Sequence, residues 1–158
     1  MNNKTKNQML GNLGEKLVAH YFSKQGYNVD FALDPFDSEK DLVVEGYTCE
    51  VKTQQPYHIL KSFTIRKSQL KKCMSVNMNF FVETPSEQSN WCTKIYLCPK
   101  DHLNFEPIGG NNDRLKINIK NMKLLQTIND KKINNRMIEL STSKWQGKNY
   151  AKQSEISC

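Results

Sequence analysis

The sequence has no uninterrupted apolar run of about 18 residues, the length at which a segment becomes a candidate transmembrane helix. Its opening stretch, MNNKTKNQML, is charged and has no apolar segment of signal length. Cysteine is present five times, an odd number, and no two cysteines form a C-x-x-C pair, which favours free thiols in a reducing compartment. We therefore expect a soluble intracellular protein without a membrane partner, either cytoplasmic or encoded by a virus and acting in the host cytoplasm.

Acidic residues are missing from one long stretch of the chain. Residues 51–82 contain none, and their six positive charges are Lys52, Lys61, Arg66, Lys67, Lys71 and Lys72. Residues 30–50, just before this stretch, hold seven acidic groups and one lysine, and the whole chain carries a net charge of +7. A compact acidic segment bordered by basic surface suits a polyanion that approaches a bound metal. The basic composition alone fits a solvated surface equally well.

The pattern of apolar residues predicts an α/β domain in which helices flank a mixed β-sheet. At 158 residues the chain is long enough for one well-packed domain. The spacing predicts helices over residues 10–25, 66–76 and 133–140. It predicts strands over residues 27–33, 80–82 and 94–98, a hairpin around residues 42–49, and an added edge strand over residues 115–120.

The hairpin places two carboxylates against each other. A two-residue loop ending in Gly46 is a common hairpin connection, and it pairs Val44 with Tyr47. The same register puts Asp41 opposite Glu50, where like charges destabilise a sheet. A divalent hard cation such as Mg²⁺, which prefers oxygen ligands, would balance such a pair.

The triplet Glu50-Val51-Lys52, with Asp41 nine residues earlier and a preceding helix that carries Glu15, resembles the PD-(D/E)xK nuclease superfamily. In style it is closest to the Holliday-junction resolvases. The resemblance covers residues 10–54 well and extends loosely to about residue 98. It implies a restriction-endonuclease-like core of order αβββαβ.

The resemblance also implies a role for each matching residue. Asp41, Glu50, the Val51 carbonyl and Glu15 would bind Mg²⁺, or Mn²⁺ as its substitute. Lys52 would orient or deprotonate the attacking water, and Gln54 would be an accessory catalytic residue. Lys40 stands where the motif has proline, and Asp37 is an alternative to Asp41.

These observations predict a metal-dependent DNA endonuclease, structure-specific for junctions or branched DNA and working as a homodimer. Residues 1–108 would form the nuclease core, and residues 109–158 a basic C-terminal extension of the same domain with a flexible tail. DNA would follow Lys61, Arg66, Lys67, Lys71 and Lys72. The alternatives are a non-catalytic nucleic-acid-binding protein, a nuclease subunit of a larger complex, and an exonuclease or restriction-type enzyme; RNA stays open as a substrate.

Overall fold

The computed structural model describes residues 3–31 and 42–141. Within these ranges the chain forms two β-sheets, three α-helices and several short 3-10 turns. The strands of the larger sheet are β1 (Val29–Phe31), β2 (Leu42–Val44), β3 (Tyr47–Gln54), β5 (Met78–Glu83), β6 (Thr93–Cys98) and β9 (Lys123–Ile128). The strands of the smaller sheet are β4 (Ser62–Arg66), β7 (Glu106–Ile108) and β8 (Asn111–Asn118). The helices are α1 (Asn3–Ser23), α2 (Leu70–Ser75) and α3 (Lys131–Ser141), and the 3-10 turns are η1 (Lys67–Gln69), η2 (Glu87–Ser89), η3 (Lys100–His102) and η4 (Ile119–Asn121).

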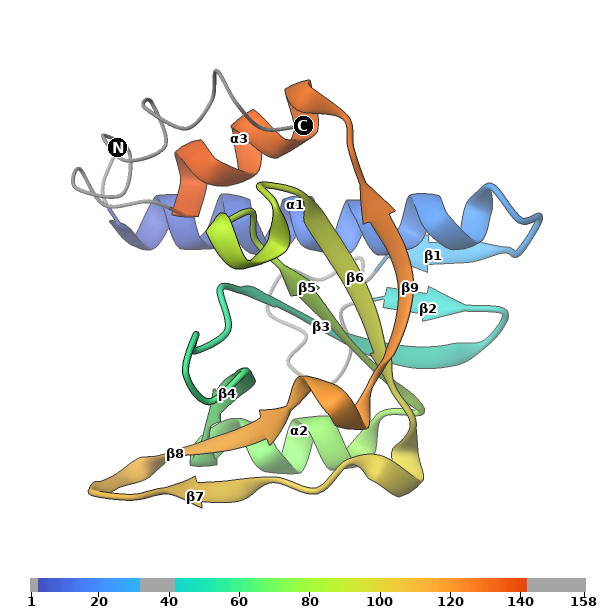
Figure 1. The fold of residues 1–158 in the computed structure, drawn as a ribbon. Coiled ribbons are helices and arrows are strands. Elements are labelled where there is room, and N and C mark those ends of the chain that lie inside the picture. The colour runs from blue at the N-terminus through green and yellow to red at the C-terminus, as the bar shows by residue number, and fades with distance from the viewer. Residues whose placement is uncertain (1–2, 32–41, 142–158) are drawn as a thin grey trace.

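The larger sheet is mixed, with the strand order β1-β2-β3-β5-β6-β9 (Figure 1). Strands β3 and β5 run parallel, and every other neighbouring pair in this sheet is antiparallel. The parallel pair needs a crossover, which β4, η1 and α2 supply between β3 and β5. The predicted fold class, an α/β domain with a mixed sheet flanked by helices, is confirmed.

The β2–β3 hairpin has the predicted register. Val44 pairs with Tyr47, Val43 with Thr48, and Leu42 with Cys49. Both turn residues, Glu45 and Gly46, have positive φ angles of 48° and 82°. A two-residue turn with positive φ at both positions matches the twist of the flanking strands, which explains why this dipeptide fixes the pairing.

The smaller sheet has the order β4-β8-β7. The prediction of an edge strand over residues 115–120 is therefore wrong, because β8 is the middle strand and pairs with β4 on one side and β7 on the other. Its alternation of apolar and basic residues reflects one face packed on the core and one face in solvent. Strand β9 is also absent from the sequence prediction, and it adds to β6 at the end of the larger sheet.

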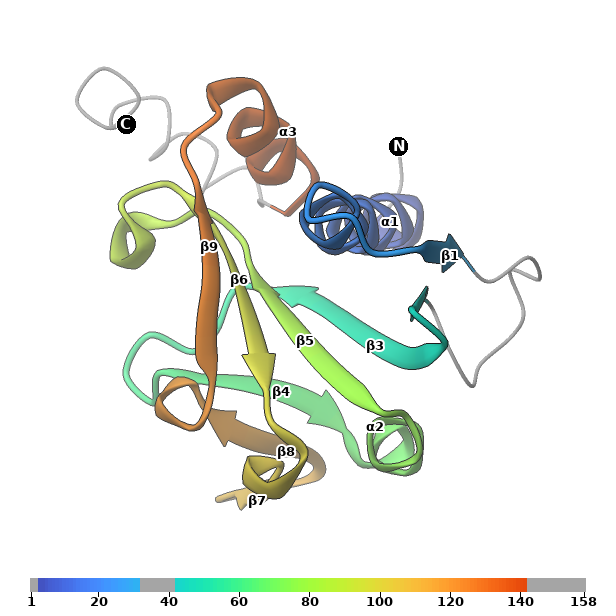
Figure 2. The ribbon, with the colours of Figure 1, turned by 90° about the vertical axis from the view of Figure 1, so that its right-hand side faces the viewer.

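Different elements cover the two faces of the larger sheet (Figure 2). On one face, α1 and α3 pack beside each other over a core that includes Cys49, Val51 and Phe80. On the other face, the smaller sheet and α2 enclose a second core around Phe63 and Phe81. Because successive strand residues alternate between faces, the side chains on either side of Val51 point toward the second layer.

The three helices fall close to their predicted positions. Helix α1 starts earlier than the predicted residue 10 and ends before Gly26, whose φ of 91° suits only glycine comfortably. The predicted basic helix over residues 66–76 is η1 followed by α2, and α3 covers the predicted residues 133–140. None of the helices in the part of the chain that the structure describes is long and apolar enough to cross a membrane.

Candidate functional site

Glu50 is a buried carboxylate held between two lysines. Its side chain is 1% exposed and lies on β3, on the face toward the second layer. Its Oε1 is 2.9 Å from Lys52 Nζ, and its Oε2 is 3.0 Å from Lys72 Nζ. Strand alternation aligns Lys52 with Glu50, and α2 brings Lys72 to the other carboxylate oxygen. A carboxylate this deeply buried needs such partners, because an unpaired buried charge is strongly destabilising.

The structure changes the expected charge balance at this position. Facing carboxylates alone would leave Glu50 in net repulsion, whereas the observed cluster of Glu50 with Lys52 and Lys72 carries a net charge of +1 from these three groups. Asp41 and its alternative Asp37 lie outside the described residues, so their approach to Glu50 stays a prediction. The register from which it follows is confirmed for the three pairs of the β2–β3 hairpin.

Glu15 lies on α1, which covers the opposite face of the sheet from Glu50. Its neighbour Gly14 sits so close to β3 that an added Cβ would come 1.8 Å from Thr53 Oγ1. Glu15 itself is partly buried. The structure thus brings this turn of α1 against the strand that carries Glu50 and Lys52, while the approach of the Glu15 carboxylate to a shared metal stays a prediction.

Val51, the third predicted metal ligand, contributes its side chain to the core beneath α1. Its backbone pairs in register with Phe80 of β5. On the β2 side, the described pairing reaches Cys49. The role of the Val51 carbonyl as a metal ligand stays a prediction.

Gln54 joins the two sheets. Its Oε1 accepts the Thr64 N–H at 2.7 Å, and its Nε2 donates to the Thr64 carbonyl at 2.8 Å. The amide thus pairs with the outer edge of β4 as a neighbouring peptide group would. These bonds give Gln54 a structural role that the sequence did not indicate, and they hold the smaller sheet over the face that carries Glu50.

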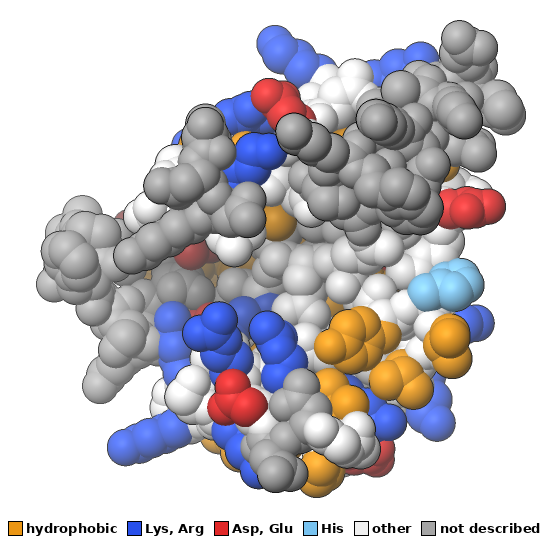
Figure 3. Space-filling model, turned by 90° about the vertical axis from the view of Figure 1, so that its left-hand side faces the viewer, with side chains coloured by type: hydrophobic (Ala, Val, Ile, Leu, Met, Phe, Trp, Pro, Cys, Tyr) orange, Lys and Arg blue, Asp and Glu red, His pale blue; other side chains and the backbone are white. Residues whose placement is uncertain are grey.

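The predicted DNA-binding residues separate into two groups. Lys61, Arg66, Lys67 and Lys71 are exposed, whereas Lys72 is 23% exposed and contacts Glu50. Figure 3 shows Lys and Arg side chains gathered on one face over the smaller sheet, with a separate group of hydrophobic side chains nearby. The exposed group is therefore available to a polyanion, and Lys72 belongs to the Glu50 cluster.

Arg114 of β8 is a basic residue that the sequence analysis did not select. It pairs directly with Arg66 across the smaller sheet, and its Nη1 donates to Thr64 Oγ1 at 3.1 Å. Two like charges at opposed positions repel each other, and a bound phosphate would relieve this repulsion. Only the pairing of β4 with β8, which are far apart in the sequence, reveals this arrangement.

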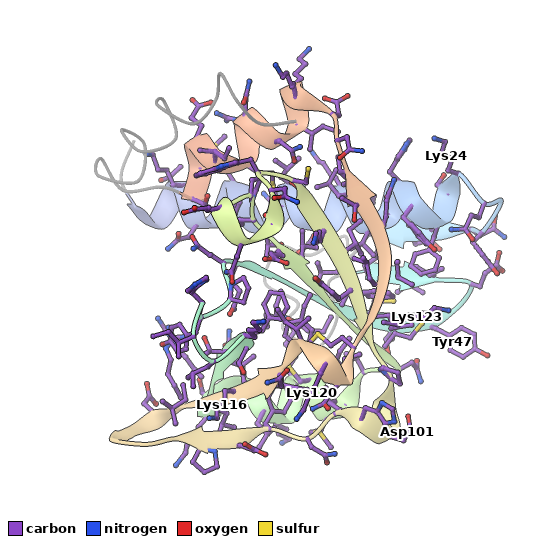
Figure 4. The ribbon with its side chains drawn as sticks, viewed as in Figure 1. Lys24, Tyr47, Asp101, Lys116, Lys120 and Lys123 are labelled. Atoms are coloured by element: carbon purple, nitrogen blue, oxygen red, sulfur yellow. The ribbon has the colours of Figure 1, made fainter. Side chains whose placement is uncertain are left out.

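A second set of basic side chains follows β8. Lys116, Lys120 and Lys123 come from β8, η4 and the start of β9, one after another (Figure 4). Lys120 and Lys123 are exposed. This row offers a second path for a polyanion in the C-terminal third of the chain.

Asn79 is a further polar residue beside Glu50 that the sequence analysis missed. It lies on β5, pairs in register with Glu50 and is 2% exposed. Its Nδ2 donates to the Cys73 carbonyl of α2 at 2.9 Å. Its Oδ1 has no hydrogen-bond partner among the described residues.

The oxygen atoms near Glu50 suit a hard cation. Within residues 3–31 and 42–141, no group of three or more His, Cys, Asp or Glu side chains is placed to hold a metal ion. The carboxylate of Glu50 and the amide oxygen of Asn79 nevertheless are oxygen ligands of the type that Mg²⁺ and Mn²⁺ prefer. The donor set fits such an ion if a further carboxylate, such as Asp41, completes it.

Burial raises the pKa values of three other titratable groups. Burial raises the pKa of the Glu83 carboxyl, against the opposing effects of Lys94 and of the Tyr96 hydroxyl, which donates to Glu83 Oε1 at 3.2 Å. Burial also raises the pKa of the Cys49 thiol to about 12 and that of the Cys98 thiol to about 11. Neither thiol is therefore a nucleophile at neutral pH.

No family model, curated protein or solved structure matches the chain. The geometry of the Glu50 cluster and the basic surface beside it are the features that indicate a function.

Proposed function

We propose that this protein is a Mg²⁺- or Mn²⁺-dependent DNA endonuclease of the PD-(D/E)xK type. One observation carries the proposal: Glu50 is buried on β3 with Lys52 two residues further along the same face, and Lys72 reaches it from α2. The strand order around it supports the proposal, because β2, β3 and β5 flank the motif as a hairpin followed by a parallel strand. Basic side chains beside the site suit a phosphodiester backbone.

In this proposal Glu50 and Asp41 would hold the cation together with the Val51 carbonyl. The resemblance adds Glu15 as a further ligand, although α1 covers the face of the sheet opposite Glu50. Bound there, such a cation would supply acidification of a water and neutralisation of charge on the phosphate. Lys52, as an ammonium paired with Glu50, would orient the attacking water. Lys72 and Lys52, which contact Glu50 in the structure, would contribute positive charge near a phosphate bound at this site.

The exposed basic residues beside the site bind the DNA backbone in this proposal. The small size of the chain favours recognition of DNA structure over a long base sequence, so we propose junctions or branched DNA as substrate and a homodimer as the active form. An exonuclease or restriction-type enzyme, or a nuclease subunit of a larger complex, would use the same site.

The ion cluster also favours a second candidate function. Glu50 is paired with two lysines, and such a buried ion cluster can also serve a structural role in a non-catalytic nucleic-acid-binding protein. One measurement separates this candidate from the nuclease: only the nuclease cuts DNA, and its cutting requires Lys52 and Glu50.

The decisive experiment incubates the purified protein with linear, nicked, single-stranded and four-way DNA and with RNA, in Mg²⁺, in Mn²⁺ and in EDTA. We expect metal-dependent cutting of branched DNA that is lost in Asp41→Asn, Glu50→Gln and Lys52→Ala, while DNA binding persists. Glu139→Gln is the matched control, since Glu139 pairs with Arg136 on α3 and is 66% exposed. Binding without cutting by the wild-type protein would favour the non-catalytic candidate.

The path of the DNA has its own test. Each phosphate contact that is lost reduces the salt dependence of binding by about 0.9 in slope. We expect Lys67→Ala with Lys71→Ala to lower the slope by about one to two units, equally for all sequences. Lys120→Ala with Lys123→Ala is the matched pair from the second basic row, and a loss confined to that pair would move the path to the C-terminal third.

A further inference from the structure

Asn79 presents an unusual buried acceptor. The side chain is 2% exposed, and the hydrogen bond from Nδ2 to the Cys73 carbonyl fixes which end of the amide is the oxygen. Oδ1 then has no donor among the described residues. A buried acceptor without a donor costs about 1–3 kcal/mol, so in native structures such an atom usually meets an ordered water or an ion.

The position of Asn79 indicates what its oxygen meets. Asn79 and Glu50 are paired neighbours on the parallel strands β5 and β3. Both side chains reach α2, Glu50 through Lys72 and Asn79 through the Cys73 carbonyl, so they lie on the same face of the sheet. Adjacent paired side chains on one face are within reach of one small ligand.

We infer that Asn79 Oδ1 is a ligand of the cation bound at Glu50, directly or through one of the ion's waters. This inference rests on the proposed metal-dependent function and extends it to a residue outside the E-x-K triplet. An amide carbonyl is a common oxygen ligand of hard divalent ions and brings no charge of its own. The parallel pairing of β3 with β5 places it beside the Glu50 carboxylate, and the bond to α2 holds its orientation.

A second buried asparagine offers a matched control. Asn134 of α3 is 4% exposed, and its Nδ2 also donates to a backbone carbonyl, that of Ile128, at 2.9 Å. Its Oδ1, in contrast to that of Asn79, accepts from both the N–H and the hydroxyl of Thr93. Replacing either asparagine by aspartate removes the same kind of donor, but only position 79 adds a carboxylate beside Glu50.

The test measures Mn²⁺ binding directly, from the electron paramagnetic resonance signal of free Mn²⁺, in the full chain without DNA. We expect Asn79→Asp to lower the dissociation constant about tenfold, because an added charged ligand tightens such sites. Asn79→Leu, which removes the oxygen, should raise it by a similar factor. Asn134→Asp should stay within about twofold of wild type, and Glu50→Gln should lose most of the binding. Circular dichroism checks that each variant is folded, and the two opposite changes at position 79 keep the test informative if one variant unfolds.

Two results would overturn the inference, and they are distinguishable. If wild type binds Mn²⁺ and Glu50→Gln does not, but both Asn79 variants bind as Asn134→Asp does, the cation lies at Glu50 without Asn79. If the wild-type protein binds no Mn²⁺, so that Mg²⁺ has none to displace, the metal-dependent function fails together with the inference.

Discussion

Replacing Glu50 by glutamine should destabilise the protein in the absence of metal. The carboxylate is 1% exposed and makes two contacts at ion-pair distance, 2.9 Å to Lys52 and 3.0 Å to Lys72. Hydrogen bonds to charged groups contribute about 1.5–3 kcal/mol each, which sets an upper limit of about 3–6 kcal/mol for the pair. The two lysines, however, are 17% and 23% exposed and can turn toward water in the variant, and the glutamine oxygen still accepts one bond. We therefore expect a loss of about 2–3 kcal/mol in the free energy of unfolding.

This sign is opposite to the one that facing carboxylates alone would give. Repulsion between Asp41 and Glu50 would make the glutamine variant at least as stable as wild type. The pairing of Glu50 with Lys52 and Lys72 reverses that expectation, because removal of the carboxylate leaves two ammonium groups beside each other.

Urea denaturation in EDTA at low ionic strength measures the effect. A loss of about 2–3 kcal/mol corresponds to about 4–12 °C in Tm for a chain of this size. The control Glu139→Gln removes an exposed ion pair with Arg136 and should change stability by at most about 0.5 kcal/mol. A Glu50→Gln variant as stable as wild type, or no less stable than Glu139→Gln, would refute the argument that this ion cluster stabilises the fold.

Three further predictions concern other contacts. Gly14→Ala should destabilise the protein by about 1–3 kcal/mol in urea denaturation, because the added Cβ would come 1.8 Å from Thr53 Oγ1. The control Gly11→Ala meets no atom within 4 Å and should stabilise α1 by up to about 1 kcal/mol. Equal effects of the two substitutions would contradict the close packing of α1 on β3. Burial raises the pKa of the Glu83 carboxyl above its ordinary 4.5, so the stability that the protonated carboxyl contributes is full below that pH and is lost as the pH rises. The stability of Glu83→Gln relative to wild type should therefore increase from acidic to neutral pH in a series of melts. A difference that does not change with pH would refute the burial effect. Gln54→Ala should cost about 1–3 kcal/mol in urea, because it removes the amide that pairs with the edge of β4 at 2.7 and 2.8 Å, and an unchanged midpoint would show that this bridge contributes nothing.

The local parts of the fold can be predicted from the sequence. A two-residue turn at Glu45 and Gly46 is enough to predict the register of the hairpin, because turn geometry and strand alternation both act within a few residues. The helical spacing of apolar residues predicts α1, and short apolar runs predict the buried strands β5 and β6. The lysines of β8 are typical of an exposed edge strand, but the same pattern arises in a middle strand with one solvent face.

The candidate site is less accessible to sequence reasoning. The E-x-K spacing places Glu50 and Lys52 on one face because it depends only on strand alternation. Lys72 and Asn79 reach Glu50 only through the packing of α2 and the parallel pairing with β5, and neither contact has a local signature. Gln54 likewise shows no pattern that indicates a bond to β4.

The position of β9 has a consequence for synthesis of the chain. Strand β6 is the neighbour of β5 on one side and of β9 on the other, and β9 is followed only by α3 among the described elements. While a ribosome is still making residues 99–122, β6 is an open edge whose unpaired N–H and C=O groups can recruit a strand from another nascent chain. Mutations that slow the docking of β9 should therefore lower the yield of soluble protein during expression more than they lower the stability of the finished fold.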